Sequence, residues 1–193
     1  MSSNLSKKIK YLFDNYGNSD YIGEEVTQKE HAIQAAMLAE EEYHNNEITI
    51  AALLHDIGHL IGIEKNLDTM DEYGIMEHEN IGYNFAINNG LGLTIAKLIK
   101  GHVYTKRYLV SKYKEYYLNL SSASKNTFEY QGGKLNTQEI QEYEKDELFK
   151  YHIKMREWDD KAKQTDIKLK SLDHFLLKID KLLNKESKLN NIN

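Results

Sequence analysis

The chain has 193 residues, a formal net charge of -5 and an isoelectric point near 5.9. This length is most simply one domain with a sizeable core, and the 25 basic residues are scattered among 30 acidic ones, which argues against a nucleic-acid surface. Cysteine is absent, so disulfides, thiolate metal sites and a cysteine nucleophile are excluded. Any bound metal must therefore be held by histidine and carboxylate side chains.

No apolar run approaches the ~20 residues that a membrane span needs. The start, Met-Ser-Ser-Asn-Leu-Ser-Lys-Lys, lacks the apolar segment of a signal peptide. We therefore expect a cytoplasmic protein without a membrane partner, and composition leaves its oligomeric state open. Proline is absent and no segment alternates polar and apolar residues for long, which favours an all-α fold over a sandwich or barrel.

In chain order the sequence predicts helices over 5–16, from 28 onward, over about 47–61, 76–89 and 92–103, from 137 to 160, and over about 171–185. Capping boxes formed by Thr27 with Glu30 and by Asn136 with Glu139 mark the starts of two of them. The segment 63–75 is predicted to be irregular, 119–135 to be a loop and 185–193 to be frayed, while the Tyr-rich segment 104–118 receives no assignment. A single domain over 1–193 is expected.

One short motif carries the chemistry: His55 and Asp56 lie side by side in the apolar run Ala-Ala-Leu-Leu-His-Asp-Ile-Gly-His. Burying an imidazole and a carboxylate is costly without a partner, and a metal cation is the usual one. His31, His55, His78 and His102 follow one another at intervals of about 24 residues, the length of a helix plus a turn. A helical bundle that delivers one ligand per helix has this rhythm, and its ligands suit iron, manganese or zinc. The alternative is a set of core histidines with purely structural partners.

The pattern resembles the HD-domain superfamily of metal-dependent helical proteins, most of which are phosphohydrolases. A narrower resemblance rests on five motifs: Tyr21-Ile-Gly-Glu24, His31-Ala-Ile-Gln-Ala-Ala, His55-Asp-Ile-Gly-His59, the Ser-x-Ala-Ser…Gln-Gly-Gly loop and Arg156-Glu-Trp-Asp159-Asp160. Together they are similar to the HD-domain di-iron oxygenases that cleave organophosphonates, which are relatives of myo-inositol oxygenase. The resemblance covers roughly residues 20–165, the expected metal-binding core, and implies an HD-domain helical bundle against which the helix at about 171–185 packs.

The resemblance implies two iron ions as an Fe(II)/Fe(III) pair, with O2 as co-substrate. Its metal ligands fall on six residues, with Asp56 as the bridge: His31, His55, Asp56, His78, His102 and Asp159. We take Asp159 rather than Asp160 as the last ligand, because Asp159 and Lys163 match the Asp-x-x-x-Lys pattern of the inositol oxygenase relative. Asp160 remains the alternative.

Lys106 lies one helical turn after His102, so its ammonium can reach the same pocket and bind a dianionic phosphonate; a solvated surface lysine is the alternative. The resemblance adds four substrate-binding residues: His59, Ser124, Thr127 and Gln131. It also implies catalytic and substrate-binding roles for Tyr21 and Glu24. Tyr21 would occupy an iron at rest and swing away when substrate arrives, and the Glu24 carboxylate would receive a substrate ammonium group. The alternatives are metal tuning for His59 and ordinary loop capping for Ser124 and Thr127.

The activity implied by the resemblance is cleavage of the carbon–phosphorus bond of a 1-hydroxyphosphonate, a small-molecule organophosphonate, to phosphate and a carboxylic acid. Glu24 favours an amine-bearing substrate, 2-amino-1-hydroxyethylphosphonate, which would give glycine. Hydroxymethylphosphonate and a trimethylammonium analogue stay open. The main alternative is an HD-domain phosphohydrolase that acts on a nucleotide or another phosphate ester with nearly the same ligands. A non-catalytic sensor or scaffold is a third interpretation.

Overall fold

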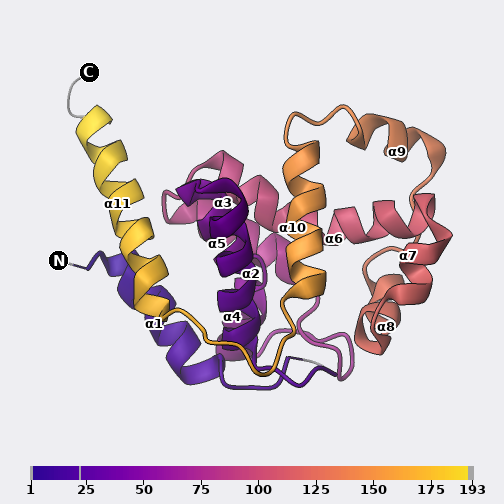
Figure 1. The fold of residues 1–193 in the computed structure, drawn as a ribbon, viewed down its shortest axis with the longest axis horizontal. Helices are drawn as coiled ribbons and strands as arrows, with labels where there is room; N and C mark the ends of the chain where they lie inside the picture. Colours follow the sequence, from indigo (N-terminus) through magenta and orange to yellow (C-terminus); the bar gives the residue numbers. More distant parts are fainter. Residues whose placement is uncertain (1, 22, 191–193) are drawn as a thin grey trace.

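The computed structural model describes residues 2–21 and 23–190, with side chains through Lys185. Within these residues the chain forms eleven helices and no strand, which confirms the predicted all-α fold (Figure 1). The helices are α1 (Asn4–Tyr16), α2 (Gln28–Tyr43), α3 (Asn46–Leu54), α4 (Ile57–Lys65), α5 (His78–Asn88), α6 (Leu93–Lys112), α7 (Lys114–Asn119), α8 (Ser122–Tyr130), α9 (Thr137–Tyr143), α10 (Phe149–Lys161) and α11 (Leu172–Asn190).

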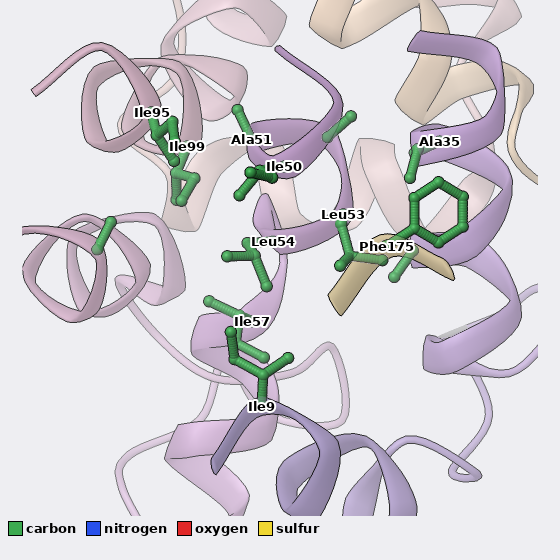
Figure 2. Close-up of a cluster of buried hydrophobic side chains, with 14 of the residues drawn as sticks. Ile9, Ala35, Ile50, Ala51, Leu53, Leu54, Ile57, Ile95, Ile99 and Phe175 are labelled. Atoms are coloured by element: carbon green, nitrogen blue, oxygen red, sulfur yellow. The ribbon is translucent and has the colours of Figure 1, made fainter. Parts of the chain in front are cut away.

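The core is built around α3, which is apolar on nearly every side. Ile50, Leu53 and Leu54 are fully buried because α2, α6, α10 and α11 all pack against this helix. A helix that is apolar all round has to be covered all round. Figure 2 shows Ile99 of α6 and Phe175 of α11 approaching α3 from different sides. The outer layer consists of α1 and α11 at one edge, whereas α7, α8 and α9 lie at the opposite end (Figure 1).

The helix predicted over 47–61 is wrong as a single element, because the chain breaks at His55 and Asp56. Asp56 has φ -104° and ψ 11°, which is not a helical conformation, and α4 starts directly after it. In a continuous helix the two side chains would diverge by about 100° around the axis. The break instead lets both of them face the interior. Gly58 then allows α4 to touch α5, since a Cβ there would lie 1.9 Å from the carbonyl oxygen of His78.

The middle of the chain is more helical than predicted. α6 continues to Lys112 and α7 follows, so the Tyr-rich segment that received no assignment is helical. The stretch 119–135, predicted as a loop, contains α8. Ser121 caps this helix by accepting a hydrogen bond from the Ser124 N–H, and Phe128 packs with Val110. A cap and a tertiary contact therefore stabilise a segment whose composition favours a loop.

The long helix predicted from 137 to 160 is also wrong as one element. Asn136 and Glu139 form the predicted capping box, but α9 ends at Tyr143 and α10 begins at Phe149. Between them Asp146 accepts a hydrogen bond from the Leu148 N–H, which closes a turn and starts a new helix.

The C-terminal helix is confirmed, with four residues of its apolar stripe buried: Leu172, Phe175, Leu176 and Ile179. The prediction that 185–193 is frayed is wrong through Asn190, where α11 ends, and 191–193 lie outside the described residues. Among the helices that are described, none has the length and apolarity to cross a membrane.

Candidate metal centre and substrate cavity

Four histidines that are far apart in the sequence meet in the interior as two close pairs. His31 of α2 and His55 from the α3–α4 break place their Nε2 atoms 3.0 Å apart. His78 at the start of α5 and His102 of α6 place theirs 3.1 Å apart. Two nitrogens bound at a right angle to one ion, each at ~2.1 Å, would be separated by about 3.0 Å. Each pair therefore has the spacing of two ligands to a shared cation.

The outer nitrogen of three of these rings shows which nitrogen carries the proton. The Nδ1 atom of His31 lies 2.9 Å from the Ala162 carbonyl, that of His55 lies 2.8 Å from the Ala52 carbonyl, and that of His102 lies 2.6 Å from the Ile99 carbonyl. A carbonyl oxygen only accepts hydrogen bonds, so each Nδ1 must donate. In a neutral ring the inner Nε2 is then a bare lone pair.

Two bare lone pairs at 3.0 Å repel each other unless a positive charge lies between them. Without a metal, a proton on His55 can supply this charge. The pKa of His55 is raised to about 9 despite burial, because Asp56 and Asp159 lie beside it. A metal cation meets the same requirement while leaving both rings neutral. The donor set thus fits a metal, and without sulfur it suits iron, manganese or zinc.

Asp56 lies between the two pairs. Its Oδ1 is 3.4 Å from the Nε2 of His78 and 3.2 Å from that of His102, while its Oδ2 is 3.4 Å from the Nε2 of His55 and 3.7 Å from that of His31. Burial alone would raise the pKa of this carboxyl, but the imidazoles, His55 foremost, hold the pKa well below its ordinary value. One oxygen for each pair is the arrangement expected of a bridging ligand.

Asp159 and Asp160 face different partners. Asp159 is buried, and its Oδ1 lies 3.4 Å from the Nε2 of His31. Asp160 instead accepts hydrogen bonds from Arg156 and Tyr116 at the edge of the site. The second oxygen of Asp159 is also held by Arg156, at 2.7 Å. The guanidinium therefore orients Asp159 toward the first imidazole pair, and of the two acids only Asp159 reaches the histidines.

Two candidate cation positions follow from these contacts. The first position is surrounded by four groups: His31, His55, Asp56 and Asp159. The second position is surrounded by His78, His102 and Asp56. The structure thus brings together all six residues predicted as metal ligands.

His59 differs from the four inner histidines, although its ring stacks on His78 with centroids 4.0 Å apart. The Ile75 N–H donates to its Nδ1 at 3.0 Å, so the proton of the neutral ring is on Nε2. Burial and the neighbouring His78 lower the pKa of His59 well below its ordinary value, which keeps the ring neutral. His59 therefore offers an N–H donor rather than a second lone pair for metal.

A small cavity of about 60 Å³ borders this cluster. All seven residues predicted to bind substrate line it: Tyr21, Glu24, His59, Lys106, Ser124, Thr127 and Gln131. The last three are brought to one wall by α8 and its C-terminal end, where spacings of three and four residues put them on a common face. The helix that was missed in the sequence thus explains why these residues share the cavity.

Lys106 is buried in the wall, not solvated as its alternative interpretation held. Its Nζ donates to the Thr127 hydroxyl at 2.9 Å and to the Ser124 carbonyl at 3.3 Å. Burial, together with the nearby positive charge of Arg156, lowers the pKa of Lys106 to about 7. The ammonium is held by neutral oxygens alone, so it is available to an anion in the cavity.

Tyr21 and Glu24 lie at the side of the cavity near the first position, and Ile22 between them is outside the described residues. The Tyr21 ring stacks on His31 with centroids 3.8 Å apart, and its hydroxyl donates to Asp159 at 3.3 Å. Burial and the adjacent Asp159 raise the pKa of this phenol well above its ordinary value, so it stays protonated. Glu24 forms an ion pair with Lys163 at 2.6 Å.

Comparisons with known proteins show to which family the chain belongs. The HD domain family matches residues 29–120. The chain is 35% identical over 161 residues to the 1-hydroxy-2-(trimethylamino)ethylphosphonate dioxygenase (glycine-betaine-forming) of Leisingera caerulea, covering 83% of this chain and 81% of that enzyme. It is 36% identical over 171 residues to the hydroxymethylphosphonate dioxygenase of Gimesia maris, covering 84% and 82%. The chain belongs to the HD-domain phosphonate oxygenase family.

A further relative is an uncharacterized protein of Acanthamoeba polyphaga mimivirus, 49% identical over 152 residues, which are 79% of this chain and 69% of the relative. The HD-domain match ends at residue 120, so it includes all four inner histidines but not Asp159. The narrower resemblance to the phosphonate oxygenases, which uses motifs on both sides of that match, is confirmed by the two named enzymes.

Five polar residues that line the cavity were not predicted as site residues: Gln28, Tyr73, Ser121, Arg156 and Lys163. Arg156 stood in a quoted motif, and its spacing of one turn from Asp159 on an otherwise buried helix face was a usable signal. The contact of Lys163 with Glu24 joins segments far apart in the chain, so no local pattern reveals it. Tyr73 comes from the irregular segment after α4.

Proposed function

We propose that this protein is a di-iron enzyme that uses O2 to cleave the carbon–phosphorus bond of a 1-hydroxyphosphonate. The observation that carries the proposal is the position of one carboxylate, Asp56, between two imidazole pairs. A small cavity lies beside it, and the wall of that cavity contains the buried cation Lys106. The favoured substrate is 2-amino-1-hydroxyethylphosphonate, which would yield glycine and inorganic phosphate. The ligands proposed for the irons are the residues around the first and second positions.

The overall reaction balances with one molecule of O2. The substrate R–CH(OH)–PO3²⁻ and O2 become R–COOH and HPO4²⁻, so the C–P and C–H bonds break, and carbon and phosphorus each gain an oxygen atom. The carbon–phosphorus bond has no bridging oxygen to leave with the electrons, which makes oxidation at the carbon the accessible route. When bound, the iron pair supplies open coordination positions and the electrons that activate dioxygen.

The cavity residues bind and orient the phosphonate group. Lys106 contributes a buried ammonium that can exchange its contact with Thr127 for a phosphonate oxygen. The His59 Nε2–H supplies a neutral donor from the wall formed by α4. Donors on two sides of a small cavity fix the direction of the substrate, so that its hydroxyl-bearing carbon points toward the cluster.

In this proposal the Tyr21 side chain blocks access to the first position until substrate binds. Its hydroxyl bonds to Asp159 and its ring covers His31, so the phenol lies directly against two of the proposed ligands. Arrival of substrate would displace it and expose that side of the cluster. An oxidising site that opens only with substrate present avoids wasteful reaction with water or protein.

The size and charge of the cavity support a small substrate that carries an anionic phosphonate at one end and a cationic ammonium group at the other. A volume of about 60 Å³ is far below the ~300–1,000 Å³ of sites for drug-sized ligands, which disfavours a nucleotide ester. Lys106 suits the phosphonate end, and Glu24 offers a carboxylate for an ammonium at the other end. To accept that ammonium, Glu24 would exchange its contact with Lys163.

The test is to load the purified protein with iron without oxygen, and then to add O2 with each candidate phosphonate. The candidates are the 2-amino-1-hydroxyethyl, hydroxymethyl and trimethylammonium compounds, and phosphate release and O2 uptake are measured together. We expect one phosphate for each O2, with the amino compound turned over best. Phosphate released from a phosphate ester without O2 uptake would instead establish a phosphohydrolase.

A further inference from the structure

Glu79 has no role in the proposed reaction, yet its carboxylate lies behind one of the inner histidines. It follows His78 directly, in the first turn of α5. The Glu79 Oε2 atom is 3.7 Å from the His78 Nδ1 atom, on the side of the ring that faces away from the second position. Both atoms are buried, and neither has a hydrogen-bond partner among the described residues.

The other three inner histidines show what is different about His78. Their Nδ1 atoms donate to backbone carbonyls, which are neutral and fixed by the helices that carry them. Among the four, only the Nδ1 atom of His78 lies beside an ionisable side chain, that of Glu79. A carboxylate behind a ligand imidazole fixes the ring and makes it a stronger donor to the metal, more so than a carbonyl does.

The number of carboxylates around each position also favours a role for Glu79 at the second position. Two carboxylates, Asp56 and Asp159, approach the first position, whereas Asp56 alone approaches the second. A cation at the second position therefore has less negative charge around it. A carboxylate hydrogen-bonded to His78 would place further negative charge close to that cation, transmitted through the ring.

The geometry points to Glu79 as a positioning residue that strengthens metal binding at the second position by accepting a hydrogen bond from the His78 Nδ1–H. Closing 3.7 Å to a hydrogen bond requires only a small side-chain movement of Glu79, whose side chain is 16% exposed. This inference rests on the proposed di-iron function. It assigns Glu79 no contact with substrate.

The test is an anaerobic titration of metal-free protein with Fe(II), in which the affinity of each of two sites is resolved. The variants are Glu79→Gln, which keeps an acceptor but removes the charge, and Glu79→Ala, which removes both. Glu77→Gln is the matched control, because it removes the same charge from an exposed residue next to His78. Thermal unfolding of each metal-free variant reports on any purely structural effect.

We expect Glu79→Ala to weaken one of the two iron sites by about 10- to 100-fold and Glu79→Gln to weaken it less. The other site, and both sites in Glu77→Gln, should keep the wild-type affinity. Two unchanged sites in Glu79→Ala would overturn this inference and leave the proposed function standing, as would equal weakening of both sites. Wild-type protein that binds only one iron would overturn both proposals. Neither oxygen nor phosphonate is present, so the result is independent of turnover.

Discussion

The histidine cluster and the cavity wall opposite it are held in place by different kinds of contact. In the cluster His31, His55 and His102 are anchored to backbone carbonyls of the buried bundle. In the wall, side chains hold other side chains, as Lys106 does Thr127 and Lys163 does Glu24. The cluster is therefore preformed, whereas substrate must replace contacts that the wall makes with itself. Substitutions in the cluster should remove metal, and those in the wall should change what is bound.

The largest effect is expected for Asp56→Asn, since this side chain faces both imidazole pairs. The amide keeps the shape but loses the charge and one of the two acceptor oxygens, so both proposed iron sites should weaken. Turnover should fall about 10³-fold or more. Elemental analysis of iron per chain, together with O2 uptake, measures this. A variant that retains two irons and near-normal turnover would show that Asp56 is not a bridge.

The next effect separates the two neighbouring acids. Asp159→Asn should lose iron from the first position and keep about one iron per chain, with turnover reduced roughly a hundredfold or more. Asp160→Asn is the matched control, because its carboxylate faces Arg156 and Tyr116 and its side chain is 30% exposed. It should keep two irons. The reverse result, with iron lost only from Asp160→Asn, would make Asp160 the ligand.

The same contrast explains which parts of the molecule the sequence could predict. Each inner histidine lies on or next to a helix with a buried apolar face, and the regular spacing of the four indicated a bundle with a shared centre. The break between α3 and α4 was missed because the run around His55 is largely apolar and contains no proline, and because Asp56, the N-cap residue of α4, was interpreted only as a metal ligand.

The cavity wall was less predictable because short elements depend on tertiary contacts. α8 is rich in Ser, Asn and Thr, which favour turns and caps over helix interiors, and its helical form depends on the Ser121 cap and the packing of Phe128. The ion pair of Glu24 with Lys163 joins residues from opposite ends of the resemblance. Neither contact leaves a periodic signal in the sequence.

The wall can be tested through Lys106→Met, which keeps the length of the side chain but removes the charge. We expect kcat/KM for the phosphonate to fall about a hundredfold, because the anion loses a buried cation. In the wild type the pKa of about 7 predicts that kcat/KM declines as pH rises through that value, since the ammonium loses its proton. This limb of the pH profile should be absent from the variant. A limb that persists in Lys106→Met would assign it to another group.

The stability of Lys106→Met should change in the opposite direction to its activity, because the fold no longer has to bury a charge. The folded-state pKa of Lys106 lies below its unfolded value of 10.5, so the unfolded chain binds more protons between pH 7 and 10.5. The penalty for burying this charge is thus complete below pH 7 and is relieved as pH rises. Lys106→Met should stabilise the metal-free protein on the order of 2 kcal/mol at neutral pH, with a smaller gain near pH 10. Urea unfolding at the two pH values measures the difference.

The smallest and most selective effect is expected for Glu24→Ala. The variant loses the carboxylate proposed to receive a substrate ammonium, so kcat/KM for 2-amino-1-hydroxyethylphosphonate should fall by about 10- to 100-fold. Hydroxymethylphosphonate has no ammonium and should change by less than about threefold. Glu25→Ala, at an exposed neighbouring residue, should leave both substrates unaffected.

The ion pair with Lys163 makes this last comparison sharper. Glu24→Ala also frees the Lys163 ammonium, which lines the same cavity. A freed cation should repel the ammonium group of the amino substrate, whereas hydroxymethylphosphonate carries no ammonium to repel. Both consequences of the substitution therefore act against the amino substrate. Equal losses for the two substrates would mean that Glu24 acts by shaping the cavity. The substrate preference would then have to arise from other residues that line the cavity.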